Sequence, residues 1–367
     1  MFFIIGIFMA ITLIVLLILK KNTSQADRVL GLWLAVIGVH LGYFYAVDSG
    51  KIVDFPWLLG MDFSLPLVQG VFLYFYARSL TGPSLRIREI ALHLLPSLLL
   101  ILVGIPFYAL SADTKIAIVM RGEDHAYEWF DWLQDSSMLV SGFSYSLAVL
   151  FLVKKHKKRI ENSFSNTENK TLNWLRNLTL GLIGIWLVVL FSDNPVFIFS
   201  GVVVFVLYLG FYGINQTTIF SSAAELENEL SSSIKDDVTE KQYKKSGLKR
   251  EVAAVIYARL KDLMHTDKLY LEPELTLGEL AARLETTPNY VSQIINEYES
   301  KSFYQYINAL RVEEFLVICK RPEYRSYTIL AMAMECGFKS KSTFNKHFKE
   351  ITGKTPRAIL IEESLVS

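Results

Sequence analysis

The chain has 367 residues, of which 52% are hydrophobic and 20% are charged, and its formal net charge is +1. The length suits two domains, and the hydrophobic fraction is high for a soluble protein. Cys319 and Cys336 are the two cysteines, which excludes a disulfide framework and fits a reducing compartment. The average conceals a division, because apolar runs fill residues 1–213 whereas residues 214–367 have an ordinary soluble composition.

Seven apolar stretches approach the roughly 20 residues that a helix needs to cross a bilayer. They cover residues 2–19, 29–47, 56–77, 90–110, 137–153, 175–191 and 195–213. The first stretch is followed, not preceded, by basic residues, Lys20 and Lys21, which is the reverse of a secretory signal peptide. We therefore expect it to remain as a membrane span with its N-terminus outside.

Lysine and arginine are divided unequally between the loops, and this division sets the expected orientation. One set of loops carries Lys20, Lys21, Arg28, Arg78, Arg86, Arg88, Lys154, Lys155, Lys157, Lys158, Arg159 and Lys170, whereas the alternate set carries Lys51, Lys115 and Arg121. Because basic loops stay in the cytoplasm, we expect a multi-pass protein of the inner (cytoplasmic) membrane. Its C-terminal part would then share a compartment with DNA.

Three polar side chains, His40, Asp62 and Gln69, fall inside the apolar stretches. Polar groups at membrane depth are costly and often functional, so one interpretation is a site for a ligand or a proton. The other interpretation is that they hydrogen-bond between helices and hold the bundle together. Pro66 lies between Asp62 and Gln69 and predicts a kink in that span.

Residues 214–248 are polar and rich in Ser, Glu and Lys, which predicts a flexible cytoplasmic linker. Such a linker transmits proximity or dimerisation, so a homodimer is among the assemblies that this organisation allows. The predicted domains are a seven-span domain at 1–213, the linker at 214–248 and a soluble domain at 249–367.

A first helix-turn-helix pattern runs from Thr276 to Tyr298. Thr276 and Glu279 form a capping box before a helix with one apolar face, and Thr287 can cap a second helix that has Pro288 at its first position. On that second helix the predicted inward residues are Val291, Ile294, Ile295 and Tyr298. The predicted outward residues, which suit base edges in the major groove, are Asn289, Ser292, Gln293 and Asn296.

A second pattern of the same plan runs from Thr328 to Ile351. Gly337 should stop its first helix by taking the left-handed conformation, and Gly353 and Pro356 should end its second helix. The predicted inward residues of the second helix are Phe344, Phe348 and Ile351. Its predicted outward residues are Lys341, Ser342, Thr343, Asn345, Lys346 and Lys349. One long helix, residues 303–319, should connect the two patterns.

Residues 251–360 resemble the DNA-binding domain of AraC/XylS-type transcription regulators. The resemblance rests on the runs LTLGELA at 275–281, PNYVSQ at 288–293, AMECGFKSKSTF at 333–344, FK at 348–349 and GKTP at 353–356. It implies two helix-turn-helix units joined by a linker helix. It also implies base contacts from Asn289, Ser292 and Gln293 in the first helix-turn-helix motif. In the second motif it implies base contacts from Lys341, Ser342, Thr343 and Lys346. The seven-span part is similar to the membrane-bound regulators of this type.

The chain departs from that family near its C-terminal end. The family usually has an aromatic residue and an arginine where this chain has Ile359 and Leu360, so an apolar contact is kept while a basic group is lost. From Lys301 to Arg357 there are eleven Lys and Arg against five Asp and Glu. Neutralisation of DNA phosphates should therefore depend mainly on the second helix-turn-helix motif.

These patterns predict an all-α protein, with a seven-helix membrane bundle followed by two helix-turn-helix units joined by a linker helix. Its expected function is that of a membrane-integrated transcription regulator, with a double-stranded DNA operator, the lipid bilayer and an unknown signal as partners. The alternatives are a receptor or transporter whose C-terminal domain binds protein, and a bundle that is only an anchor. We expect no enzyme activity, cofactor or metal, because the chain has no nucleophile–base set, phosphate-binding glycine loop or zinc-ligand spacing.

Overall fold

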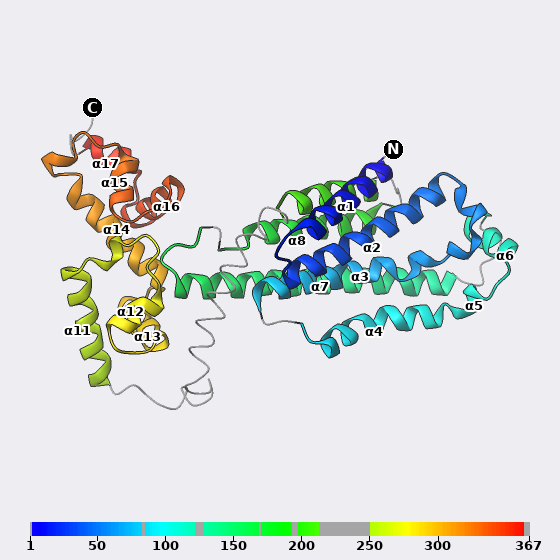
Figure 1. The fold of residues 1–367 in the computed structure, drawn as a ribbon, viewed down its shortest axis with the longest axis horizontal. Helices are drawn as coiled ribbons and strands as arrows, with labels where there is room; N and C mark the ends of the chain where they lie inside the picture. The colour runs from blue at the N-terminus through cyan, green and yellow to red at the C-terminus, as the bar shows by residue number, and fades with distance from the viewer. Residues whose placement is uncertain are drawn as a thin grey trace. The chain divides into compact units, whose positions relative to one another are not determined.

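The computed structural model describes residues 2–82, 85–121, 128–168, 170–192, 197–212 and 250–362 (Figure 1). Their regular structure is helical, which confirms the expected all-α class. The chain divides into two compact units, Met1–His156 with Leu172–Glu225, and Lys157–Thr171 with Leu226–Ser367. The expected linker at 214–248 lies outside the described residues.

The first unit has a helix at each expected apolar stretch. The longer helices are α1 (Phe2–Leu19), α2 (Gln25–Asp48), α3 (Leu65–Thr81), α4 (Ile87–Val103), α7 (Glu128–Ser163), α8 (Asn173–Phe191) and the helix Phe197–Tyr212. The shorter elements are η1 (Lys51–Asp54), η2 (Pro56–Leu58), η3 (Met61–Phe63), α5 (Ile105–Tyr108), α6 (Ala112–Ile116) and a π-helical turn, η4 (Ala117–Arg121). The end of α7, from Lys157 onward, belongs to the second unit.

Among the described helices, α2, α7 and α8 are long and apolar enough to cross a membrane. The bent pair Pro56–Phe63 and Leu65–Thr81, with an angle of 49° at its break, is a fourth candidate. The helices Phe3–Leu19 and Phe197–Tyr212 are apolar but shorter. A total of seven spans therefore stays a prediction.

The expected kink near Pro66 takes the form of a break in the helix. Ser64 separates η3 from α3, and Pro66 occupies the first turn of α3, where its missing N–H needs no partner. Asp62 lies in η3 and Gln69 lies in α3, so the two side chains come from different sides of the break.

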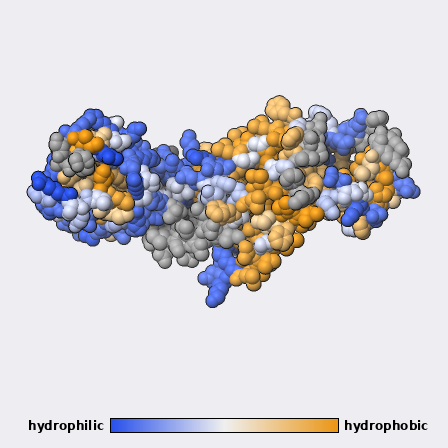
Figure 2. All heavy atoms as spheres, turned by 90° about the horizontal axis from the view of Figure 1, so that it is seen from above, coloured by the Kyte–Doolittle hydropathy of each residue, from blue (hydrophilic) through white to orange (hydrophobic). Residues whose placement is uncertain are grey.

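Apolar side chains form the core of the first unit and also cover much of its outside. Trp33 is fully buried and its ring contacts Tyr76 and Phe205. Figure 2 shows a broad hydrophobic surface. Exposed apolar side chains include Phe8, Ile18, Leu92, Phe151 and Phe191. Water-soluble monomers rarely expose apolar patches of this extent, so the surface favours contact with lipid.

The second unit is a chain of short helices. They are α11 (Arg250–Thr266), η5 (Leu269–Leu271), α12 (Leu277–Arg283), α13 (Pro288–Glu299), α14 (Phe303–Ile318), η6 (Pro322–Tyr324), α15 (Ile329–Glu335), α16 (Lys341–Thr352) and α17 (Pro356–Glu362). The pairs α12–α13 and α15–α16 occupy the two expected helix-turn-helix positions, and α14 occupies the position of the connecting helix.

α14 contributes to two separate hydrophobic cores. Phe303 and Ile307, in its first half, pack with residues of α11, α12 and α13. Val312 and Phe315, in its second half, pack with residues of α15 and α16, among them Phe344. One continuous helix therefore holds both helix-turn-helix pairs.

Local signals in the sequence account for the helix ends. Thr276 and Glu279 form the predicted capping box, and Thr287 caps α13 with Pro288 at the first position. Gly337 and Gly353 have φ values of 87° and 74°, as the two predicted helix stops require.

Two residues that were expected to face inward are exposed. Tyr298 is 39% exposed and Ile351 is 45% exposed. Both lie in the last turn of their helices, beyond the end of the core, and Tyr298 stacks on Tyr257 instead, with ring centroids 4.4 Å apart. The prediction of inward positions was wrong for these two residues.

Gly337 and Gly353 both have a left-handed backbone conformation. Alanine at each position therefore separates the cost of the φ value from the cost of crowding by neighbouring atoms. We predict that Gly353→Ala costs about 1–2 kcal/mol through its φ value alone, because a Cβ there meets no atom within 4 Å. Gly337→Ala should cost clearly more, because its Cβ would lie 2.7 Å from the Leu271 carbonyl oxygen and 2.9 Å from that of Tyr270. Amide hydrogen exchange of α15 and α16 in the detergent-solubilised chain measures both costs. Equal losses would show that the neighbouring carbonyls move aside.

Candidate nucleic-acid interface

The predicted reading residues of the first pair lie on the open face of α13. Asn289, Gln293 and Asn296 are exposed and Ser292 is half-buried. Their spacing places them on neighbouring turns of the helix. The opposite face, including Val291, is fully buried against the rest of the unit. α13 therefore presents amide and hydroxyl groups to solvent while its apolar face fixes it in place.

α16 repeats this arrangement with a basic face. The predicted residues Lys341, Ser342, Lys346 and Lys349 are exposed, and Thr343 is half-buried. The buried face is formed by Phe344, His347 and Phe348. Lys346 Nζ lies 3.9 Å from a carboxylate oxygen of Glu350. Lys341 and Lys349 form no ion pair with any residue that the structure describes. The exposed face of α16 therefore carries positive charge that a phosphate could neutralise.

The departure from the family pattern is explained by packing. Leu360, at the position where the family usually has arginine, is buried in the second core, and Ile359 packs partly against the same core. α17 therefore contributes an apolar contact here and offers no basic group at position 360 for a phosphate.

A polypeptide segment that the sequence did not connect with DNA binding packs within the same unit. Residues 164–171, which follow α7 and are called the docking loop below, belong to the second unit. Phe164 pairs with Thr276 in an isolated antiparallel bridge, and the Ser165 N–H donates to the Leu275 carbonyl at 3.1 Å. Ser165 is 1% exposed. The docking loop is therefore an integral part of this unit.

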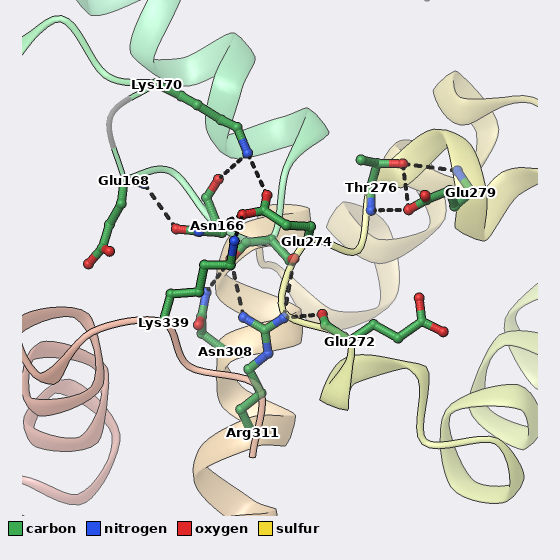
Figure 3. A network of polar contacts seen from close by, with 11 residues as sticks. Asn166, Glu168, Lys170, Glu272, Glu274, Thr276, Glu279, Asn308, Arg311 and Lys339 are labelled. Carbon is green, nitrogen blue, oxygen red and sulfur yellow. Dashed lines mark hydrogen bonds and ion pairs between the residues drawn. The ribbon is translucent and has the colours of Figure 1, made fainter. Parts of the chain in front are cut away.

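Arg311 and Asn308 of α14 hold the docking loop from inside the unit (Figure 3). Arg311 is 1% exposed and donates to the carbonyls of Tyr270 at 2.6 Å and Glu272 at 2.7 Å, and to the Ser165 hydroxyl at 3.2 Å. Asn308 donates to the Ser165 carbonyl at 3.2 Å. Burial lowers the pKa of Arg311 to about 10, so the side chain remains charged at neutral pH and needs these acceptors.

Glu274 connects the docking loop with the residues that precede α16. Its carboxylate accepts hydrogen bonds from Asn166 at 3.1 Å and from Lys170 at 2.8 Å, and it pairs with Lys339 (Figure 3). Partial burial would raise the pKa of Glu274, but the hydrogen bonds from Lys170 and Lys339 lower it to about 2. At neutral pH the carboxylate is therefore ionised and binds both lysines.

In the first unit, the three polar residues singled out by the sequence line one cavity of about 400 Å³. His40, Asp62 and Gln69 lie among aromatic and aliphatic side chains. The Trp33 indole N–H donates to the Gln69 side-chain oxygen at 2.8 Å, so Gln69 is bonded between helices, as one of the two interpretations expected.

Other polar atoms of the same cavity have no hydrogen-bond partner among the described residues. They are His40 Nε2, Asp62 Oδ1, Gln134 Oε1 and Trp186 Nε1. Buried polar atoms without partners are costly and suggest a bound polar group. Gln134 and Trp186 were not predicted. The described ranges contain no group of three or more His, Cys, Asp or Glu side chains that could hold a metal ion.

Comparison with known proteins bears on the second unit. Residues 280–360, from α12 to α17, match the family model of a helix-turn-helix domain. A search of the curated proteins and a search of the solved structures each found no match. The matched range covers both α13 and α16 with their exposed polar faces. Together with the sequence motifs, this match supports a C-terminal helix-turn-helix of the AraC type at residues 280–360.

Proposed function

We propose that this protein is a membrane-integrated transcription regulator that binds a specific DNA operator through α13 and α16. The observation that carries the proposal is the shared arrangement of these helices within the matched range: each buries its apolar face in a core built on α14, and each leaves a polar face open. Gln293 and its neighbours on α13 would read base edges. The lysines of α16 would also neutralise phosphates.

Membrane integration is supported by the apolar helices and by the charge of the loops. α2, α7 and α8 have the length and composition of membrane spans. The basic cluster from Lys154 to Arg159 lies toward the C-terminal end of α7, which precedes the docking loop. Under the positive-inside rule that end of α7 is cytoplasmic, where DNA is accessible. The match at 280–360 favours DNA over protein as the partner of the C-terminal domain.

The cavity of the first unit supports a ligand-binding function for the bundle. Its walls are mostly apolar, its volume lies within the roughly 300–1,000 Å³ of small-molecule sites, and its unpartnered polar atoms include acceptors and a donor. A small amphipathic molecule that carries hydrogen-bonding groups fits this chemistry. In the expected orientation His40, Asp62 and Gln134 lie toward the outer side, so the ligand would arrive from outside the cell.

The direct test of DNA recognition uses the full chain in lipid nanodiscs, because the docking loop completes the second unit. Selection from random DNA duplexes at physiological salt should enrich one sequence. Enrichment of none would favour the alternative in which the C-terminal domain binds a protein.

We predict that Gln293→Ala lowers affinity by about 1–3 kcal/mol at one base position and relaxes specificity there, because an amide can contact a base edge. Lys349→Ala should instead weaken binding to all sequences and reduce the salt dependence by about one ion, because it removes a phosphate contact. Binding measured over a series of salt concentrations and operator variants separates the two effects. A uniform loss for both variants would refute the division into base and phosphate contacts.

We predict that Asp62→Asn changes operator occupancy in cells by about fivefold or more, the lower end of ordinary allosteric coupling, because it alters the polar end of the cavity. Asp54→Asn, on an exposed position of η1 outside the cavity, is the control. Chromatin immunoprecipitation at equal protein levels measures occupancy. If both variants match the wild type, the bundle is only an anchor.

A further inference from the structure

Glu168 of the docking loop lies at the N-terminus of α16. The Thr343 hydroxyl donates to a Glu168 carboxylate oxygen at 2.6 Å, and the Ser340 hydroxyl donates to the same oxygen. Ser340 caps α16, and its hydroxyl accepts from the Thr343 N–H at 3.2 Å. The N-terminus of a helix carries partial positive charge from its free N–H groups, so it favours an anion. Here the anion is the carboxylate of Glu168.

The same end of α16 is where the proposed function requires DNA. Lys341, Ser342 and Thr343 form its first turn, and all three are predicted DNA contacts. A DNA phosphate and a glutamate carboxylate have the same sign of charge and accept hydrogen bonds from the same donors. Because Thr343 donates to Glu168, its hydroxyl cannot donate to DNA at the same time.

A second carboxylate binds Lys339, two residues before the start of α16. Glu274 pairs with Lys339, and it also accepts from Lys170 and Asn166 of the docking loop. The residues that lead into α16 therefore meet acidic side chains twice, Lys339 at Glu274 and Ser340 at Glu168. The docking loop takes part at both places, because Glu168 belongs to it and because its Asn166 and Lys170 side chains bind Glu274.

We propose that Glu168 occupies the phosphate-binding end of α16 as an intramolecular substitute for DNA, so that operator binding requires Glu168 to detach from α16. This inference rests on the proposed function, because it assumes that α16 binds DNA. The docking loop connects α7 to α8, and the larger part of α7 and all of α8 belong to the apolar first unit. A change in those helices would favour or oppose detachment, which gives the membrane part control over DNA binding.

The residues of the docking loop differ in burial, which is compatible with partial release. Ser165 is buried and is held by Arg311 and Asn308. Glu168 is only half-buried, and Lys170 binds a Glu274 side chain that is 51% exposed. Glu168 and Lys170 can therefore leave their partners while the buried Ser165 and Asn166 stay in place.

The competing interpretation is that Glu168 merely caps α16 and stays in place when DNA binds. The two interpretations predict opposite results for one variant. If Glu168 is a cap, removing its charge loosens α16 and weakens DNA binding. If Glu168 competes with DNA, removing its charge exposes the phosphate site and strengthens DNA binding.

The experiment measures operator affinity of the full chain in nanodiscs at one fixed salt concentration. Glu168→Gln should bind about tenfold more tightly than the wild type, because a charge-assisted contact no longer has to be broken. Glu161→Gln is the matched control: it removes the same charge from the end of α7, where Glu161 lies 3.8 Å from Lys157. The control should change affinity by less than about twofold, because Glu161 forms no hydrogen bond or ion pair with the described residues of α16 and its ion pair with Lys157 is partly exposed.

Lys170→Gln provides a second variant that separates release from simple electrostatics. It removes a positive charge, which by itself would weaken binding to DNA. It also removes one of the two hydrogen bonds by which the docking loop binds Glu274, so the inference expects tighter binding. Weaker binding by both Glu168→Gln and Lys170→Gln, or affinities equal to the wild type, would overturn the inference and leave the proposed function intact. A wild-type chain and variants that bind no DNA sequence would overturn the proposed function, and the inference with it.

Discussion

A buried arginine cation requires several acceptors, and the second unit is organised around that requirement at Arg311. Its pKa falls only to about 10, so the charge persists in a site with almost no exposure to water. α14 supplies the cation, the segment before α12 supplies two carbonyls, and the docking loop supplies Ser165. The loss of any one acceptor would leave charge unsatisfied in a low dielectric, so this constraint fixes the helices and the loop together.

The two units meet the cost of buried polar groups in different ways. In the second unit, Arg311 and Asn308 bind acceptors supplied by distant parts of the chain. In the first unit, apolar side chains fill the core and the outer surface, and several polar atoms around the cavity have no partner among the described residues. Atoms without a described partner also occur in the second unit, at Asn308 Oδ1 and His347 Nε2, but in the first unit four of them border one cavity.

The sequence predicted the helix-turn-helix units well, because caps, glycine stops and apolar periodicity act over a few residues. The prediction of inward-facing residues failed at Tyr298 and Ile351, because the apolar periodicity of each helix continues past the end of the hydrophobic core. The sequence could not reveal the docking loop, because Ser165 and Asn308 are 143 residues apart and neither stands out in its local context. The cavity was found only in part: polar residues inside apolar runs are conspicuous, whereas Gln134 precedes the stretch expected to span the membrane.

The second unit is built from two separate parts of the chain, which limits how a protease could separate it from the first unit. Many anchored proteins are released when a protease cuts one connecting segment, and residues 214–248 would be the obvious place to cut. Here that cut would leave residues 250–362 held non-covalently by Ser165 and its neighbours, which remain joined to α7 and α8. In the proposed regulator, proteolysis at this single point would therefore leave the DNA-binding part attached to the first unit through residues 164–168.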